Sequence, residues 1–193
     1  ESRRSVRVFD ETKIPEKIMR ERLRLAVLAP NSSNLQTGEL FWVRDPEKKK
    51  NLVKYCFSQP AAKTAQELVV AVARPDRWKE INDLMLAKFD EKKKIRLKAA
   101  YQYYSSIVPK AYNMGPFGIY GPFKQLYVWY KGLRRPMPRG PFSLSGMRLW
   151  AQKSTALACQ NFMLAIRAHG FDSCPMEGMD AKRVKALLNL SKG

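Results

Sequence analysis

The spacing of apolar positions changes along the chain between a helical period and a strand-like one. Helical spacing predicts helices from Pro15 to Leu28, from Pro46 to about Phe57, from about Arg77 to Ser106, through Trp150 to Gly170, and after Asp180. Short apolar runs predict strands at residues 39–43 and 67–73, and the continuous run of the second suggests burial on both of its faces. This order of elements indicates a mixed α+β domain rather than a regular βαβ winding.

Residues typical of helix ends support several of these boundaries. Pro15 suits a first helical position, and Asp45 and Asp180 suit N-caps. Gly170 suits a left-handed C-cap, and His169 beside it favours the helix dipole. We therefore interpret His169 as a capping residue rather than a catalytic one.

Three stretches between these elements carry turn-forming residues. Residues 29–38 form a polar loop, and residues 171–180 form a strand-like turn. Between residues 109 and 141, Pro and Gly recur, acidic residues vanish and aromatic residues crowd in. No regular element longer than a turn or two is expected there.

Composition and charge narrow the class of protein and of partner. The 193 residues suit one domain with a real core, and 45% hydrophobic residues exclude wholesale disorder. The 36 Lys and Arg residues against 17 Asp and Glu give a net charge of +19, which points to anionic partners. No acidic residue lies between Glu91 and Asp172, an interval with 14 basic residues.

Cysteine usage and hydropathy restrict the compartment. Cys56, Cys159 and Cys174 are odd in number and widely spaced, which argues against a disulfide framework or a structural zinc site. A reducing, cytoplasmic compartment is expected. No apolar run approaches the ~18–20 residues that span a bilayer. Because the sequence opens at Glu1 without Met, we expect it to be trimmed.

Three short segments could carry chemistry, and each also has a simpler explanation. Arg3, Arg4, Ser5 and Arg7 could grip a phosphate, although a solvated basic terminus is favoured on this segment alone. The amides and hydroxyls of residues 31–36 could bind a heterocycle or a ribityl-like chain, or could simply form a turn. The turn at residues 174–178 could present backbone N–H groups to a ligand.

Taken together and in this order, the three segments resemble the FMN-dependent nitroreductase family. The matching pieces are RRSVRVFD at the start, APNSSNLQ after it, and STALACQNFMLAIRAHGFDSCPMEGMD near the end. The resemblance covers about residues 1–75 and 145–190, and the last piece is the most specific. The resemblance implies an α+β nitroreductase-like fold in which helices flank a mixed central sheet. It also implies that residues 1–193 form a single domain.

The resemblance also implies a cofactor, partners and a cycle. Family members are homodimers with FMN in two sites at the subunit interface. NADH or NADPH reduces the flavin and leaves, and an electron acceptor then takes the electrons from the same face in a ping-pong cycle. The chemistry belongs to the flavin, so no side chain is expected to be catalytic.

Carried over by position, the resemblance assigns cofactor-binding roles to twelve residues. Arg3, Arg4, Ser5 and Arg7 would hold the FMN phosphate and ribityl chain. The partner subunit's loop would reach the flavin, and a C-terminal turn would line the isoalloxazine with a backbone N–H directed at N5. The loop residues are Pro30, Asn31, Ser32 and Asn34, and the turn residues are Pro175, Met176, Glu177 and Gly178.

Two departures from the family pattern stand out. Thr37 occupies a position where many relatives have Pro, which alters the loop but leaves the expected FMN contacts in place. Relatives also continue after the last helix into another strand and a tail with a further basic phosphate ligand. We therefore expect the C-terminal strand and tail to be missing from this sequence.

The acid-free middle of the chain, about residues 100–145, falls outside the resemblance. Its aromatic and basic residues favour a lid over the flavin that shapes the acceptor pocket, or an excursion packed on its own domain. Peripheral contact of residues 101–139 with an anionic membrane ranks second, and single-stranded nucleic acid ranks third.

These observations favour an FMN-dependent oxidoreductase that passes electrons from NAD(P)H to a nitro-compound, a quinone or a similar conjugated acceptor. The alternative is a basic protein that binds membranes or nucleic acid on a nitroreductase-like scaffold, with the flavin lost or incidental.

Overall fold

The computed structural model describes residues 2–91 and 98–190, and the chain divides into two compact units. Unit 1 takes in the residues up to Ala29, Leu40–Val72 and the residues from Leu157 onward. Unit 2 takes in Pro30–Glu39 and Ala73–Ala156. Each unit is described by itself below, and the expected single domain stays a prediction.

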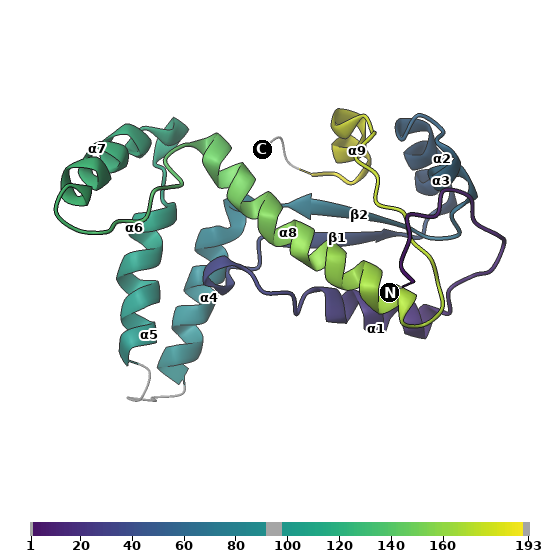
Figure 1. Ribbon diagram of the computed structural model, residues 1–193, viewed down its shortest axis with the longest axis horizontal. Coiled ribbons are helices and arrows are strands. Elements are labelled where there is room, and N and C mark those ends of the chain that lie inside the picture. The colour runs from purple at the N-terminus through teal and green to yellow at the C-terminus, as the bar shows by residue number, and fades with distance from the viewer. Residues whose placement is uncertain (1, 92–97, 191–193) are drawn as a thin grey trace. The chain divides into compact units, whose positions relative to one another are not determined.

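Unit 1 is built on a two-stranded sheet whose strands run antiparallel (Figure 1). Just beyond the ladder, the N–H of Arg74 donates to the carbonyl oxygen of Thr37 at 2.7 Å, which fixes the register. Its elements, with the C-terminal part of α8, are α1 (Glu16–Ala26), β1 (Gly38–Val43), α2 (Pro46–Tyr55), α3 (Pro60–Thr64), β2 (Leu68–Ala73), α8 (Leu144–Arg167) and α9 (Ala181–Leu187).

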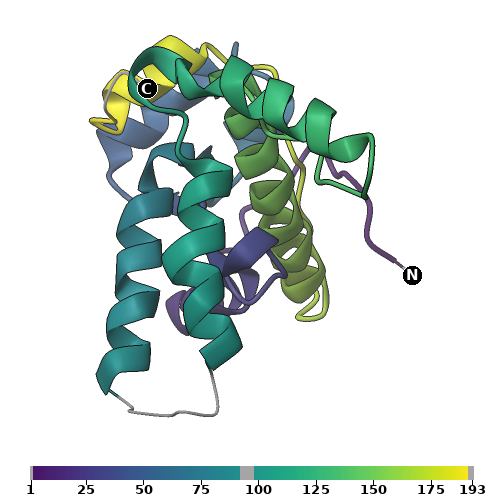
Figure 2. The same ribbon diagram turned by 90° about the vertical axis from the view of Figure 1, so that its left-hand side faces the viewer.

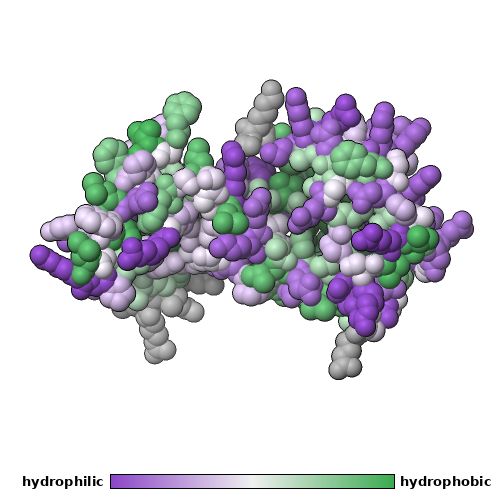
Figure 3. Space-filling model, turned by 45° about the horizontal axis from the view of Figure 1, so that its top comes forward, coloured by the Kyte–Doolittle hydropathy of each residue, from purple (hydrophilic) through white to green (hydrophobic). Residues whose placement is uncertain are grey.

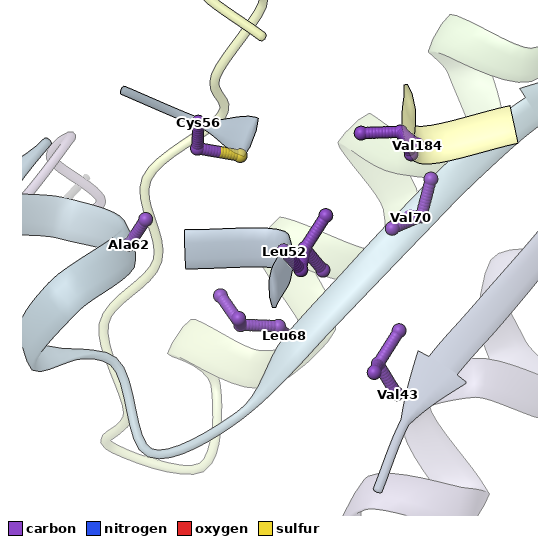
Figure 4. Packing of buried hydrophobic residues seen from close by; sticks show 7 residues of the cluster. All are labelled: Val43, Leu52, Cys56, Ala62, Leu68, Val70 and Val184. Atoms are coloured by element: carbon purple, nitrogen blue, oxygen red, sulfur yellow. The ribbon is translucent and has the colours of Figure 1, made fainter. Parts of the chain in front are cut away.

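The core of unit 1 lies between the sheet and helices α2, α3 and α9. Figure 4 shows its buried side chains pointing toward one another: Val43, Leu52, Cys56, Ala62, Leu68, Val70 and Val184. In β2, Leu68 and Val70 are buried, whereas Val69 and Ala71 are only half-buried and line a cavity. Burial of β2 is therefore complete on the face that packs into this core and partial on the face that lines the cavity.

The helix ends follow the expected capping chemistry with one shift. The Asp45 carboxylate accepts from the Lys48 N–H at 2.8 Å, and the Asp180 carboxylate accepts from the Arg183 N–H at 3.1 Å. Gly170 has a φ of 84°, which confirms its left-handed role after α8. Pro15 precedes the first helical residue of α1 instead of occupying it.

Unit 2 is helical and has its own core. The helices, together with the N-terminal part of α8, are α4 (Trp78–Glu91), α5 (Lys98–Gln102), α6 (Val108–Tyr112) and α7 (Tyr120–Gly132). A π-helical turn at Tyr103–Ile107 joins α5 to α6, and 3₁₀ turns lie at Ser32–Asn34, Pro75–Arg77 and Pro116–Gly118. The buried residues are Leu35, Tyr104, Val108, Tyr112, Met114 and Met147.

The helix expected from Arg77 to Ser106 is not one helix. Helices α4 and α5 run antiparallel and side by side (Figures 1 and 2). The rings of Phe89 on α4 and Tyr104 in the π-helical turn lie 5.7 Å apart, whereas in one straight helix they would be separated by about 22 Å. Residues 92–97, part of the expected helix, lie outside the described residues. A shared amphipathic period cannot by itself distinguish one long helix from two that pack on each other.

The stretch from Pro109 to Pro141 is more regular than expected, because it contains the 13-residue helix α7. Pro122 stands in the first turn of this helix, where its missing N–H breaks no intrahelical hydrogen bond. Gly121 lies so close to the backbone of Phe142 that a Cβ at Gly121 would overlap the Phe142 carbonyl oxygen. Pro122 and Gly121, expected to break a helix, thus lie in the first turn of α7, and Gly121 lets this helix pack closely against Phe142.

Candidate functional site

In unit 1, the N-terminal segment lies beside the C-terminal turn. Ser5 and Ser173 form an isolated parallel β-bridge, although almost the whole chain separates them in sequence. Two of the three segments singled out from the sequence are therefore neighbours in space. The bridge puts the arginines around Ser5 next to the residues that precede Pro175.

Arg167 and Asp172 reinforce this junction, and the sequence argument missed both. The Nε of Arg167 donates to the Ser2 hydroxyl at 2.9 Å, and its Nη1 donates to the Asp172 carboxylate at 2.9 Å. Arg167 ends α8, so its side chain links the helix to both segments. The only sequence signal was a basic residue in a last helical turn followed by an acid, a common pattern at helix ends.

Two polar atoms at the junction are buried without a hydrogen-bond partner among the described residues. They are Nη1 of Arg3 and the hydroxyl oxygen of Ser173. Leaving such a group unsatisfied costs about 1–3 kcal/mol, so native structures normally supply a partner. A guanidinium N–H and a hydroxyl that both need partners suit an anionic oxygen such as that of a phosphate.

The C-terminal turn is fixed by Gln59, another residue that the sequence did not indicate. The Gln59 side-chain amide donates to the carbonyl oxygens of Gly178 at 2.7 Å and Cys56 at 3.1 Å. A Cβ at Gly178 would lie 2.8 Å from the same amide nitrogen, so a larger residue would disturb this contact. Met176 packs against the core of unit 1, which anchors the turn from the other side.

A cavity of about 590 Å³ lies within unit 1 next to this turn. Its walls come from the N-terminal segment, β2, the C-terminal part of α8 and the residues that follow it. Of the twelve predicted site residues, Pro175 and Met176 line it. Apolar and sulfur-containing side chains dominate the walls, including Phe162, Met163 and Cys159, so the cavity suits an apolar group.

The third predicted segment, at residues 30–34, belongs to unit 2 and is held by tyrosines. The Ser33 hydroxyl lies 2.7 Å from the Tyr103 hydroxyl and 2.9 Å from that of Tyr112, which is also 3.1 Å from the Ser32 hydroxyl. The Tyr104 hydroxyl donates to the Ser33 carbonyl oxygen at 3.1 Å. Part of the acid-free stretch thus braces this loop.

The loop backbone is strained, and its amides serve the turn itself. Ser33, Asn34 and Gln36 all have φ between 45° and 56°. The Asn31 side chain accepts from the Gln36 N–H at 2.9 Å, and the Asn34 side chain accepts from the Gln36 amide at 2.9 Å. These bonds fit the turn-forming interpretation, and the flavin contact of Pro30, Asn31, Ser32 and Asn34 stays a prediction.

Thr37, the departure from the family pattern, is buried beside β1. Its side chain is 1% exposed, and its hydroxyl has no hydrogen-bond partner among the described residues. Its carbonyl oxygen accepts from the backbone of Arg74. Thr37 therefore acts through the backbone as the joint between the loop and the sheet.

An ion-pair cluster follows β2 at the start of α4. The Arg74 guanidinium contacts Glu39 at 3.1 Å and Asp76 at 2.7 Å, and Arg77 pairs with Glu39 and Glu80. The Arg74 hydrogen bond holds the pKa of Asp76 below its usual range. All of these groups are satisfied by one another, so the cluster is structural.

The remaining candidate chemistry in the described part of the chain is sparse. The three cysteines are free, and burial raises the pKa of the Cys56 and Cys159 thiols, which makes them poor nucleophiles. His169 lies 3.3 Å from the Ala165 carbonyl oxygen, as a capping residue would. Over residues 2–91 and 98–190 there is no cluster of metal ligands and no helix able to cross a membrane.

Comparison with known proteins identifies the family. The family model described as Nitroreductase family matches residues 1–193. The chain belongs to this family. Among curated relatives, an NADH dehydrogenase of Thermus thermophilus is 27% identical over 188 residues, which cover 97% of this chain and 76% of that protein.

Solved structures agree at the level of the fold. A Staphylococcus epidermidis protein described as an NAD(P)H:FMN oxidoreductase superposes with a TM-score of 0.71 at 22% identity, covering 98% of this chain and 76% of its own. An Exiguobacterium sibiricum protein described as a nitroreductase in complex with FMN superposes with a TM-score of 0.70 at 19% identity, covering 98% and 78%. The α+β nitroreductase-like fold inferred from the three motifs is confirmed, and the family match also includes the middle of the chain.

Proposed function

We propose that this protein is an FMN-dependent NAD(P)H oxidoreductase that reduces a nitro-compound, a quinone or a similar conjugated acceptor. The observation that carries the proposal is the Ser5–Ser173 bridge, which joins two predicted cofactor-binding segments. Two buried polar atoms beside it have no partner in the part of the chain that the structure describes. The family match and a relative solved with FMN support the same cofactor.

The N-terminal residues fit the phosphate end of FMN. Arg3 supplies a buried N–H, and Ser173 supplies a buried hydroxyl oxygen. Neither has a hydrogen-bond partner within residues 2–91 and 98–190. Arg4, Ser5 and Arg7 would add charge and a further hydroxyl around a dianionic group. Arg167 holds this segment in position through Ser2 and Asp172, so the arginines are preorganised rather than ordered by the ligand.

The turn at residues 175–178 fits the ring end. FMN, when bound, accepts a hydride from NAD(P)H and passes the electrons to an acceptor. Pro175 and Met176 would pack against the ring, and the Glu177–Gly178 backbone would direct an N–H toward N5. Gln59 holds the carbonyl of Gly178, in the peptide unit that follows, and so restrains the backbone next to this N–H. The chain's own contribution is thus to bind, orient and exclude water.

We further propose a ping-pong cycle in a cytoplasmic homodimer, with the partner subunit's residues 30–34 reaching the flavin. The tyrosine-braced and strained loop supports this role, since its shape is fixed before any ligand arrives. Residues 101–139 would in addition contact a membrane surface peripherally. Parallel double-reciprocal plots and a dimer in sedimentation velocity are the expected results. Intersecting plots would refute the ping-pong cycle, and a monomer would refute the assembly.

The decisive experiment is reconstitution with FMN. The purified protein with FMN should be yellow, and NADH or NADPH should bleach its flavin absorbance under anaerobic conditions. The double variant Arg3→Glu/Arg7→Glu should lose FMN, whereas the exposed Arg24→Glu on α1 should keep it. A colourless protein unchanged by added FMN would overturn the proposal and favour a protein that only binds.

A further inference from the structure

Helix α7 in unit 2 turns its apolar half toward solvent. Its exposed side chains include Phe123 at 72% and Leu126 at 63% exposure, followed by Leu133 at 67% just past the last turn. At 100° per residue, the exposed apolar positions occupy about half of the helix circumference without a charge among them. The exposed apolar residues on and beside α7 are Ile119, Tyr120, Phe123, Leu126, Tyr127, Trp129, Tyr130 and Leu133.

The opposite half of α7 carries its lysines and faces the rest of unit 2. Gly121 is buried against Phe142, and Lys124 is half-buried with its ammonium donating to the Ala111 carbonyl oxygen at 3.0 Å. Burial lowers the pKa of Lys124. Lys131 is also half-buried. This is the reverse of a surface helix in a soluble domain, which buries its apolar half and exposes its charges.

Exposed basic residues adjoin the apolar half. Arg134, Arg135 and Arg139 follow the end of α7 and are all exposed. Figure 3 shows green apolar side chains gathered over α7. The sequence has no Asp or Glu between Glu91 and Asp172, so no acidic side chain of this interval neutralises these arginines.

We propose that α7 and the three arginines after it form a docking surface for an anionic lipid bilayer. The surface offers what such a bilayer binds: an apolar half with Trp and Tyr, and flanking cations. A 13-residue helix is about 20 Å long, too short to cross a ~30 Å hydrocarbon core, so α7 lies in the interface. A second copy of this surface fits less well, because residues 120–139 offer no acidic side chain to pair with the arginines, whereas an anionic bilayer offers phosphate groups.

The test uses the full-length protein and vesicles. We expect co-sedimentation with vesicles of phosphatidylglycerol and phosphatidylcholine in equal parts, and little with phosphatidylcholine alone. Each arginine near the surface is worth several-fold in partitioning, so Arg134→Gln/Arg135→Gln/Arg139→Gln should weaken binding roughly 100-fold. Phe123→Gln/Leu126→Gln should also weaken it, since the apolar half would no longer insert.

A matched control separates α7 from general charge. Lys48, Lys50 and Lys54 are exposed on α2, and their triple Gln variant removes the same charge. This control should bind vesicles like the unmodified protein, and an equal loss would overturn the proposal. An oligomer that Phe123→Gln/Leu126→Gln disrupts, or binding to single-stranded oligonucleotide without vesicle binding, would also overturn it.

Flavin content reports folding in the same samples. The α7 variants should retain FMN and its bleaching by NAD(P)H, because none of the changed residues is placed at the phosphate or ring. Vesicle binding that persists in a chain without flavin would support the docking surface while refuting the proposed flavin chemistry. Flavin activity without vesicle binding would refute the docking surface and leave the proposed flavin chemistry standing.

Discussion

Replacing Arg3 by Met should change the stability of the flavin-free protein and its FMN affinity in opposite directions. The guanidinium Nη1 of Arg3 is buried with no partner among the described residues, so the unliganded chain bears an unsatisfied polar group. Arg3→Met keeps an apolar stem and removes that group. The flavin-free variant should therefore be as stable as the parent or more stable, by up to about 1–3 kcal/mol.

The loss should appear only when FMN is present. A charge-assisted hydrogen bond to phosphate contributes about 1.5–3 kcal/mol, which corresponds to roughly a 10- to 150-fold rise in Kd. At an FMN concentration about 100 times the parent Kd, ligand binding stabilises the parent by about 2.7 kcal/mol. A Kd raised about 100-fold reduces this to about 0.4 kcal/mol at the same concentration.

The assay is urea unfolding with and without FMN, together with a fluorescence titration of FMN. Arg22→Gln is the matched control. Nε of Arg22 is also buried without a hydrogen-bond partner in the described part of the chain, but Arg22 pairs with Glu21 on α1. It should change stability and leave FMN affinity unaltered. A destabilised flavin-free Arg3→Met protein with normal FMN affinity would refute the assignment, since Arg3 would then be purely structural.

The remaining predictions test the supports of the two units. Gly121→Ala on α7 should lower the free energy of unfolding in urea by about 1–3 kcal/mol, because the new Cβ would overlap the Phe142 carbonyl. In the control Gly132→Ala, the Cβ would meet only the end of Arg139 at 3.3 Å, so stability should be unchanged or higher. Equal effects of the two variants would contradict this packing. Tyr112→Phe removes the hydroxyl contacts with Ser32 and Ser33 and should lower the free energy of unfolding by about 1 kcal/mol. If the loop reaches the flavin, this variant should also bind FMN more weakly. An unchanged free energy of unfolding would show that the Tyr112 hydroxyl does not stabilise the loop. Because Arg74 holds the pKa of Asp76 below its usual range, this ion pair should contribute its full stability above about pH 4 and lose it as the pH falls further. Asp76→Asn should reduce the pH dependence of the unfolding free energy by less than about 1 kcal/mol. An unchanged pH dependence in acid would show that the pair does not contribute to stability.

Local signals predicted the helix ends and the family. Asp45, Asp180 and Gly170 act as caps because each role depends on a residue's own backbone and its next few neighbours. The three motifs identified the family for a similar reason, since each is a short segment with constrained chemistry. That two of them meet through Ser5 and Ser173 is consistent with the prediction of a shared site.

Features that depend on tertiary packing were not predicted. A continuous amphipathic pattern gave one helix where Phe89 and Tyr104 pack across two. The Pro and Gly content of residues 109–141 predicted an irregular stretch, but Pro122 and Gly121 are both compatible with helix α7. Arg167 and Gln59 were invisible because their importance comes from partners distant in the chain, which no local period records.

The bridge between Ser5 and Ser173 has a consequence for the order of events during synthesis. Ser5 leaves the ribosome well before Ser173, because a long stretch of chain separates the two residues. Any flavin captured through both segments must therefore bind after Ser173 has left the ribosome. Closing so long a loop also costs entropy, which a bound phosphate would help to offset. Bound FMN would then stabilise the contact between the two segments late in folding, in addition to its role in electron transfer.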